Sequence, residues 1–158
     1  MYIILRDDNL KPNHTVSIIN STTNNVTDII ETLQGFASGI AYNPENKNIY
    51  MSDIVDSKSI SVIDPSTNKV IKNIPVSDRN YKGDLIYNPT NGYVYATSII
   101  NDTGTVSIIN STTNNIIKNI PIGIPSDPFE KRNLLYNPTN GYVYLSGKES
   151  GLQVIKHK

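Results

Sequence analysis

Asp84 and Asn133 are the residues whose types and positions come nearest to a chemical site. They hold the same place in two copies of an internal repeat, three residues before a tyrosine, and Gly39 holds it in a third copy. Carboxylate and amide oxygens bind Ca²⁺ or Mg²⁺, so the pair predicts a candidate metal site for either ion, and no other cofactor is expected. Ca²⁺ takes about six to eight oxygens, however, and the alternative is that both side chains cap strand starts through backbone hydrogen bonds.

A second set of candidates lies in the segments that differ most between the copies. Loops carry binding residues more often than frameworks do, so these segments predict a ligand-binding surface. An arginine in such a loop can clamp a carboxylate through paired hydrogen bonds. The alternative is neutral variation in solvated loops. The candidate ligand-binding residues are Asp53, Asp56, Asp78, Arg79, Tyr81, Asp102, Asp127 and Arg132.

No catalytic motif is present, and no catalytic residue is predicted. His14 and His157 are the two histidines and lie near opposite ends of the chain, whereas a histidine metal site needs several converging imidazoles. The sequence has no cysteine, no Gly-x-Ser-x-Gly elbow and no P-loop. Tyrosines recur at fixed places, as at Tyr50, Tyr95 and Tyr144, which favours packing between repeats over a stacking surface for sugars or bases.

Repeated segments must position all of these residues. The phrase Tyr-Asn-Pro-Thr-Asn-Gly-Tyr-Val-Tyr occurs at Tyr87–Tyr95 and Tyr136–Tyr144, with a degraded copy at Tyr42–Tyr50. A second apolar phrase recurs at intervals of 44, 46 and 46 residues, starting at Val16, Ile60, Val106 and Leu152. Periods of this size indicate a solenoid or a β-propeller.

One repeat contains four short strands, predicted at 84–87, 93–97, 105–109 and 115–120. Asn91-Gly92 between two apolar runs is a strong hairpin signal. The fourth strand carries Lys118 and ends at Pro121, two devices that protect an exposed sheet edge, so it is placed on the outside. Four antiparallel strands repeated about an axis form a β-propeller blade.

The predicted fold is therefore an all-β β-propeller, a partial ring of about three and a half four-stranded antiparallel blades. The strands divide as three, four, four and three, in a partial blade at 1–37, two blades at 38–80 and 81–127, and a partial blade at 128–158. An open array leaves its end faces unsatisfied. Three arrangements resolve this: the remainder of a larger propeller, a second copy of the chain, or a small distorted four-bladed ring.

The phrases Tyr93-Val-Tyr-Ala-Thr, Thr105-Val-Ser-Ile-Ile-Asn and Ile120-Pro-Ile-Gly resemble the YVTN-type β-propeller repeat over nearly the whole chain. The chain departs from that pattern at Thr97-Ser98, where the family has Thr-Asn, and at Asp84 and Asn133, where it has glycine. The resemblance implies an extracytoplasmic or cell-surface protein that serves as a binding or interaction scaffold.

The expected function is a non-enzymatic module that binds a protein or glycan partner through the variable loops of one rim. The alternative is a metal-dependent propeller enzyme of the lactonase or lyase type. The 14 basic and 14 acidic residues include no Lys/Arg run longer than two, so no nucleic-acid partner is expected. No apolar run has the length for membrane insertion, and Met1–Leu5 is too short for a signal peptide.

Overall fold

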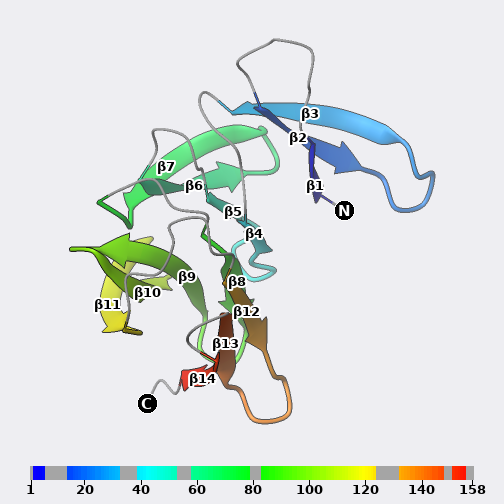
Figure 1. Ribbon diagram of the computed structural model, residues 1–158. Coiled ribbons are helices and arrows are strands. Elements are labelled where there is room, and N and C mark those ends of the chain that lie inside the picture. Colours follow the sequence, from blue (N-terminus) through cyan, green and yellow to red (C-terminus); the bar gives the residue numbers. More distant parts are fainter. Residues whose placement is uncertain are drawn as a thin grey trace.

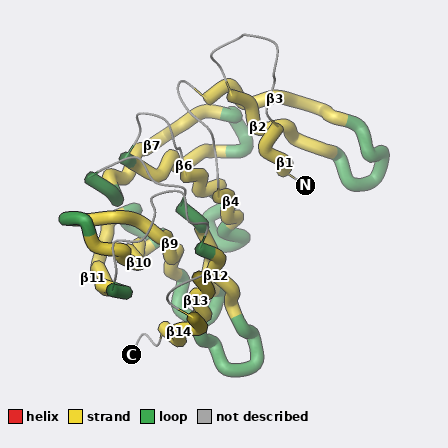
Figure 2. The backbone as a smooth tube through the Cα atoms, viewed as in Figure 1, coloured by secondary structure: helices red, strands yellow, loops and turns green. Residues whose placement is uncertain are grey.

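The computed structural model describes residues 2–5, 14–32, 39–52, 58–78, 83–123, 132–147 and 151–155. Within these ranges the chain forms strands, turns and loops, and no helix occurs (Figure 2). This secondary structure is the one expected from the sequence, because β-branched and aromatic residues of the apolar runs favour strands and the Asn, Gly and Pro residues between them favour turns.

In the described residues fourteen strands form four antiparallel sheets, which we call blades 1 to 4. Blade 1 contains β1 (Tyr2–Leu5), β2 (His14–Ile19) and β3 (Val26–Thr32). Blade 2 contains β4 (Gly39–Tyr42), β5 (Ile49–Ser52), β6 (Ser59–Asp64) and β7 (Lys69–Pro75). Blade 3 contains β8 (Leu85–Asn88), β9 (Tyr93–Ile100), β10 (Thr103–Asn110) and β11 (Asn115–Pro121). Blade 4 contains β12 (Asn133–Tyr136), β13 (Val143–Gly147) and β14 (Gly151–Ile155).

The blades fan out around a shared centre. In blades 2 and 3 the strands follow one another across the sheet in chain order, and β8 lies against both β4 and β12. Figure 1 shows these inner strands toward the middle, with β3, β7 and β11 on the outside of the open arc. The fold is a β-propeller arc with strands divided three, four, four and three, which confirms the predicted fold class. The exact blade boundaries stay a prediction.

The turn between the third and fourth strands repeats one local device. The Oδ1 atom of Asn110 accepts hydrogen bonds from the backbone N–H groups of Thr112 (2.9 Å) and Thr113 (3.1 Å). Asn114 closes the turn at a φ of 54°, in the left-handed region that asparagine tolerates. A register shift lies just before the turn, between Ile108 and Ile109, and blades 1 and 2 show the same shift. The turn falls between the strands predicted at 105–109 and 115–120, whereas the repeated β-bulge was not foreseen.

Apolar layers fill the contacts between neighbouring blades. Because strand side chains alternate, each blade has a forward face toward the next blade and a backward face toward the preceding one. The contact between blades 2 and 3 joins Ala41, Tyr50, Ile60, Val62 and Ile74 with Leu85, Tyr87, Val94, Ala96 and Ile109. The contact between blades 3 and 4 joins Tyr95, Val106, Ile108 and Ile122 with Leu134, Val143, Leu145 and Ile155. The smaller contact between blades 1 and 2 joins Val16 and Ile30 with Ile49, Met51 and Ile63.

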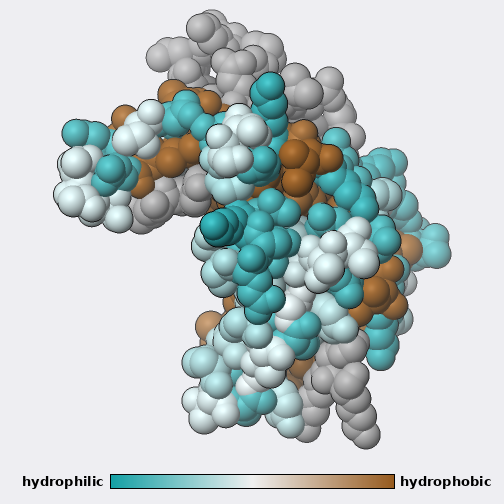
Figure 3. All heavy atoms as spheres, turned by 180° about the vertical axis from the view of Figure 1, so that it is seen from behind, coloured by the Kyte–Doolittle hydropathy of each residue, from teal (hydrophilic) through white to brown (hydrophobic). Residues whose placement is uncertain are grey.

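The forward face of blade 4 is exposed. Leu135, Leu152 and Val154 are 64%, 69% and 45% exposed, whereas Val106 and Ile108, which match Leu152 and Val154 in blade 3, are fully buried. Seen from behind, the molecule shows apolar patches at the surface among hydrophilic residues (Figure 3). A further blade would cover the exposed leucines and valine in the way that blade 4 covers blade 3.

The hairpin predicted at Asn91-Gly92 is confirmed, because β8 and β9 pair as antiparallel neighbours. Only Gly92 of the pair has a positive φ, at 72°, so the two residues do not form a type I′ turn by themselves. The glycine instead ends a longer turn in which Gly92 N donates to Asn88 O at 3.0 Å. The strands predicted at 93–97 and 105–109 are too short, because β9 extends to Ile100, β10 begins at Thr103 and only Asn101 and Asp102 form the turn.

Candidate binding rim

Two kinds of connection meet at one rim of the arc. The segment after β7 lies against the end of β9, where Asp78 N donates to Ile99 O at 3.2 Å. The hydroxyl of Ser77 donates to the same carbonyl at 2.8 Å. This rim therefore combines the connection that follows an outer strand with the turn between a second and a third strand, as the blade pattern predicts.

The tip of the β9–β10 hairpin projects at this rim as a tight turn. Asn101 and Asp102 have φ values of 49° and 59°, and two successive left-handed residues define the type I′ turn that suits the twist of a two-residue hairpin. The carboxylate of Asp78 accepts the Asn101 N–H at 2.5 Å. The structure thus brings together the segments that carry two predicted ligand-binding residues, Asp78 and Asp102, both exposed.

A shallow groove of about 270 Å³ lies beside the hairpin tip. Its walls combine hydroxyl and amide groups with the apolar surfaces of an isoleucine and a proline. The lining residues are Ile100, Asn101, Thr103, Thr105, Asn119 and Pro121. The sequence prediction missed this groove, because its far wall comes from the outer strand β11, which pattern analysis assigned to the framework.

Asp84 joins the inner strands of blades 3 and 4. Its carboxylate accepts the backbone N–H of Leu85 at 3.0 Å through Oδ1 and that of Leu134 at 2.7 Å through Oδ2. The Asp84 N–H in turn donates to the Thr97 hydroxyl at 2.7 Å. Asp84 therefore makes the strand-start hydrogen bonds of the non-metal alternative, and it makes them across two blades. Asn133, the other predicted metal ligand, precedes Leu134 and is exposed.

Arg132 is buried rather than displayed on the rim. Its side chain is 3% exposed, and its guanidinium packs against Gly104 of β10 so closely that a Cβ at Gly104 would collide with Nη1. The glycine at position 104 is thus explained by the arginine that lies over it. A role for Arg132 in clamping an external carboxylate stays a prediction, and such a ligand would have to reach a buried guanidinium.

Five of the predicted ligand-binding residues lie outside the described residues. In the sequence they fall between strands, and their roles stay a prediction. They are Asp53, Asp56, Arg79, Tyr81 and Asp127.

Tyr50 and Tyr95 pack between blades as predicted, whereas Tyr144 lies half-buried on the open face of blade 4. Tyr50 and Tyr95 are almost fully buried, and their phenol oxygens meet the side-chain amides of Asn46 (3.2 Å) and Asn91 (2.9 Å). Tyr50 also donates to Asn114 Oδ1 of the next blade at 2.6 Å. Burial raises the pKa of Tyr50 and of Tyr95, because the interior disfavours the phenolate.

The described part of the chain lacks two kinds of feature. It brings together no set of three or more His, Cys, Asp or Glu side chains that could hold a metal ion. It also contains no helix with the length and apolar character needed to cross a membrane.

Comparison with solved structures identifies the class of fold. The WD40 domain of Toxoplasma gondii coronin matches with a TM-score of 0.68 and 15% identity, over 85% of this chain and 34% of that chain. Hydrazine synthase of Kuenenia stuttgartiensis matches with a TM-score of 0.48 and 14% identity, over 86% of this chain and 49% of that one. The chain thus spans about a third and about half of the lengths of these two structures.

Identities this low show the fold alone, and that fold is the β-propeller of the WD40 domain. No protein-family model matches the chain, and no curated protein does.

Proposed function

We propose that this chain is a non-enzymatic binding module that recognises a protein or glycan partner through the rim formed by Ser77–Asp78 and the β9–β10 hairpin tip. One observation carries the proposal: the repeated framework packs in the same way in successive blades, while the rim presents a fixed hairpin tip and a groove of about 270 Å³ whose walls carry both polar and apolar groups. Rigid elements that hold a variable loop surface are the usual basis of recognition on repeat folds.

The chemistry of the rim favours a polar ligand. The carboxylate of Asp78 orients the hairpin tip through the Asn101 N–H, and the hydroxyl and amide groups of Thr103, Thr105 and Asn119 line the groove. Such groups offer both donors and acceptors, which suit the hydroxyls of a glycan or the backbone of a peptide loop. The groove is smaller than the clefts of about 300–1,000 Å³ that hold drug-sized ligands, so recognition would extend over neighbouring loops.

We also propose that the repeat is a variant of the YVTN type and that the protein acts outside the cytoplasm or at a cell surface. The proposal rests on the Tyr-Val-Tyr, Val-Ser-Ile-Ile-Asn and Ile-Pro-Ile-Gly phrases, which in the fold form the second strand, the third strand and the end of the fourth. The exposed forward face of blade 4 supports assembly into a larger ring, completed by further blades or by a second copy.

A glycan microarray and a phage-displayed peptide library, each probed with the purified chain, test the rim proposal. Thr103→Arg fills the groove and should abolish binding of the selected ligands. Thr112→Arg, on the exposed turn between the third and fourth strands, is the matched control and should leave binding unchanged. Equal loss in both variants, or binding sensitive to Thr112→Arg alone, would move the site away from this rim.

A further inference from the structure

The tip of the β9–β10 hairpin is held from the side of blade 2. The carboxylate of Asp78 accepts the Asn101 N–H at 2.5 Å, and the Ser77 hydroxyl donates to Ile99 O at 2.8 Å. Thr103 follows the tip and lines the rim groove. The segment after β7 therefore fixes the backbone of the hairpin beside the proposed binding surface.

Arg132 supports the same hairpin from the side of blade 4. Its guanidinium is buried and lies over Gly104 of β10, so closely that no Cβ fits at position 104 beside it. Because side chains alternate along a strand, Gly104 lies on the same face of β10 as Val106, which packs against blade 4. Thr103 and Thr105 of the groove lie on the opposite face. The arginine therefore stands behind the groove wall, and the strand separates it from the groove.

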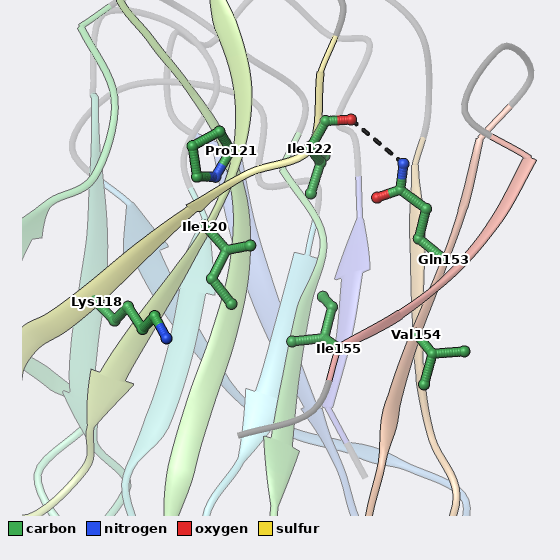
Figure 4. Close-up of a pocket in the computed structure, with 7 residues that line it drawn as sticks. All are labelled: Lys118, Ile120, Pro121, Ile122, Gln153, Val154 and Ile155. Carbon is green, nitrogen blue, oxygen red and sulfur yellow. Dashed lines mark hydrogen bonds between the residues drawn. The ribbon is translucent and has the colours of Figure 1, made fainter. Parts of the chain in front are cut away.

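Blade 4 reaches β10 at Gly104 a second time. Gln153 of β14 donates through Nε2 to Ile122 O at 3.3 Å, as Figure 4 shows. The N–H of Ile122 in turn donates to Gly104 O at 2.9 Å. The backbone of β10 is therefore held at Gly104 by Arg132 directly and by Gln153 through Ile122.

The pairing of Arg132 with Gly104 does not recur where blades 2 and 3 meet. The position of Gly104 is held by Lys58 in blade 2, and that of Arg132 is held by Gly83 in blade 3. Blades 2 and 3 nevertheless pack through an apolar layer. The framework therefore does not require the pair. What distinguishes blade 3 is its hairpin, whose strands of 8 residues each are the longest in the described part of the chain.

We propose that Arg132 is a positioning residue of the rim site: from blade 4 it holds the β9–β10 hairpin tip in the conformation that recognises the ligand, and its guanidinium does not touch that ligand. The proposal rests on the rim function proposed for this chain, and it gives the arginine a role other than clamping an external carboxylate. A tip that is held from both sides loses less conformational freedom when a ligand binds, which raises the affinity.

Amide hydrogen exchange of the ligand-free chain, resolved by NMR, tests the positioning role. Arg132→Ala should raise the exchange rate of the Asn101 N–H by about tenfold relative to that of Ile108 in the middle of β10, because the tip opens locally while the sheet stays paired. Tyr136→Phe is the matched control. It removes a contact of the same two blades at the opposite rim, the 2.7 Å pair of the Tyr136 and Thr90 hydroxyls, and should leave this ratio unchanged.

A double variant separates the role of the arginine from a general loss of packing. Gly104→Ala collides with the guanidinium in the original chain, but its methyl group occupies vacated space when it is combined with Arg132→Ala. The double variant should therefore bring the Asn101 exchange ratio back toward its original value, a coupling that independent sites do not show.

Binding is measured with the glycan or peptide that the array or library selects and that Thr103→Arg no longer binds. Arg132→Ala should weaken this binding about fivefold, and Tyr136→Phe should leave it unchanged. The proposal is overturned if the Asn101 exchange ratio stays constant in Arg132→Ala, if Tyr136→Phe raises it equally, or if the affinity does not fall.

Loss of carboxylate-bearing ligands alone, with an unchanged exchange ratio, would assign the guanidinium to the ligand and so also overturn the proposal. If no selected ligand depends on Thr103, the proposed rim function fails, and the exchange ratios still decide whether Arg132 holds the tip.

Discussion

Replacing Asp84 by Ala should destabilise the fold, because this carboxylate joins two blades. It accepts the N–H groups of Leu85 at 3.0 Å and Leu134 at 2.7 Å, and both of these residues are buried. A hydrogen bond to a charged group contributes about 1.5–3 kcal/mol. Asp84 is partly exposed, so water can replace part of the contribution of these two hydrogen bonds. We therefore expect a total loss of about 2–3 kcal/mol in the free energy of unfolding.

Urea unfolding at pH 7, followed by circular dichroism, measures this loss as a shift of the midpoint at constant slope. Asp84→Asn keeps one acceptor oxygen and should lose about half as much. The matched control is Asn133→Ala, at the equivalent and exposed position of blade 4, which should change the free energy of unfolding by less than about 0.5 kcal/mol.

The same titration separates the structural role of Asp84 from metal binding. A ligand that binds only the folded chain raises its stability, so a metal site would make the midpoint rise with Ca²⁺ or Mg²⁺ and fall with EDTA. If the carboxylate serves the backbone instead, neither addition moves the midpoint. The reasoning is refuted if Asp84→Ala unfolds within about 0.5 kcal/mol of the original chain, or if Ca²⁺ stabilises the original chain and not the variant.

Three further predictions follow from the packing between blades. Gly39→Ala should cost about 1–3 kcal/mol, since its Cβ would lie 2.8 Å from Gly83 O of the next blade; an unchanged melting temperature would contradict the close approach. Tyr50→Phe should cost about 1–2 kcal/mol, because the part-buried Asn114 Oδ1 loses the donor from Tyr50. Tyr144→Phe on the open face should cost less than about 0.5 kcal/mol, and both are measured by urea unfolding. The free energy of unfolding should fall as the pH rises above about 10, because the unfolded chain then loses phenol protons that Tyr50 and Tyr95 keep in the folded chain. Urea midpoints that stay constant over the pH range in which free tyrosine ionises would contradict this prediction.

Repetition made the strands predictable. The strands β8 and β11 lie within one residue of the predicted ranges 84–87 and 115–120, because alternation and turn residues recur with the same spacing in each copy. The β9–β10 hairpin was underestimated, since its type I′ turn is formed by Asn101-Asp102, a pair with a weaker turn signal than Asn-Gly. Local sequence therefore predicts an element better than it predicts the length of that element.

The candidate site was less predictable, because it depends on contacts between blades. The burial of Arg132 follows from the absence of a side chain at Gly104, in a different blade. The bond from Leu134 to Asp84 joins residues whose proximity follows only from the assembled arc. Asn119 lines the rim groove although its strand was assigned to the framework. Sequence patterns identify the faces of strands but do not show which residues of neighbouring blades meet.

The central claim is that successive repeats pack face to face around one centre, and a disulfide cross-link tests it directly. A Cβ built on Gly141 of blade 4 lies 3.7 Å from the Thr90 Cβ of blade 3, within the range of about 3.5–4.5 Å found in disulfides. Gly141 has a φ of 72°, and Lys47 adopts 62° at the equivalent place, so the turn accepts a side chain there.

The chain has no cysteine of its own, so Thr90→Cys with Gly141→Cys can be scored by mass spectrometry after air oxidation. Glu45→Cys with Gly141→Cys is the control. Glu45 holds in blade 2 the position that Thr90 holds in blade 3, and it therefore lies two blades away from Gly141. The account predicts a disulfide in the first pair and none within the control chain. Equal cross-linking of the two pairs, or none in the first, would contradict the arrangement.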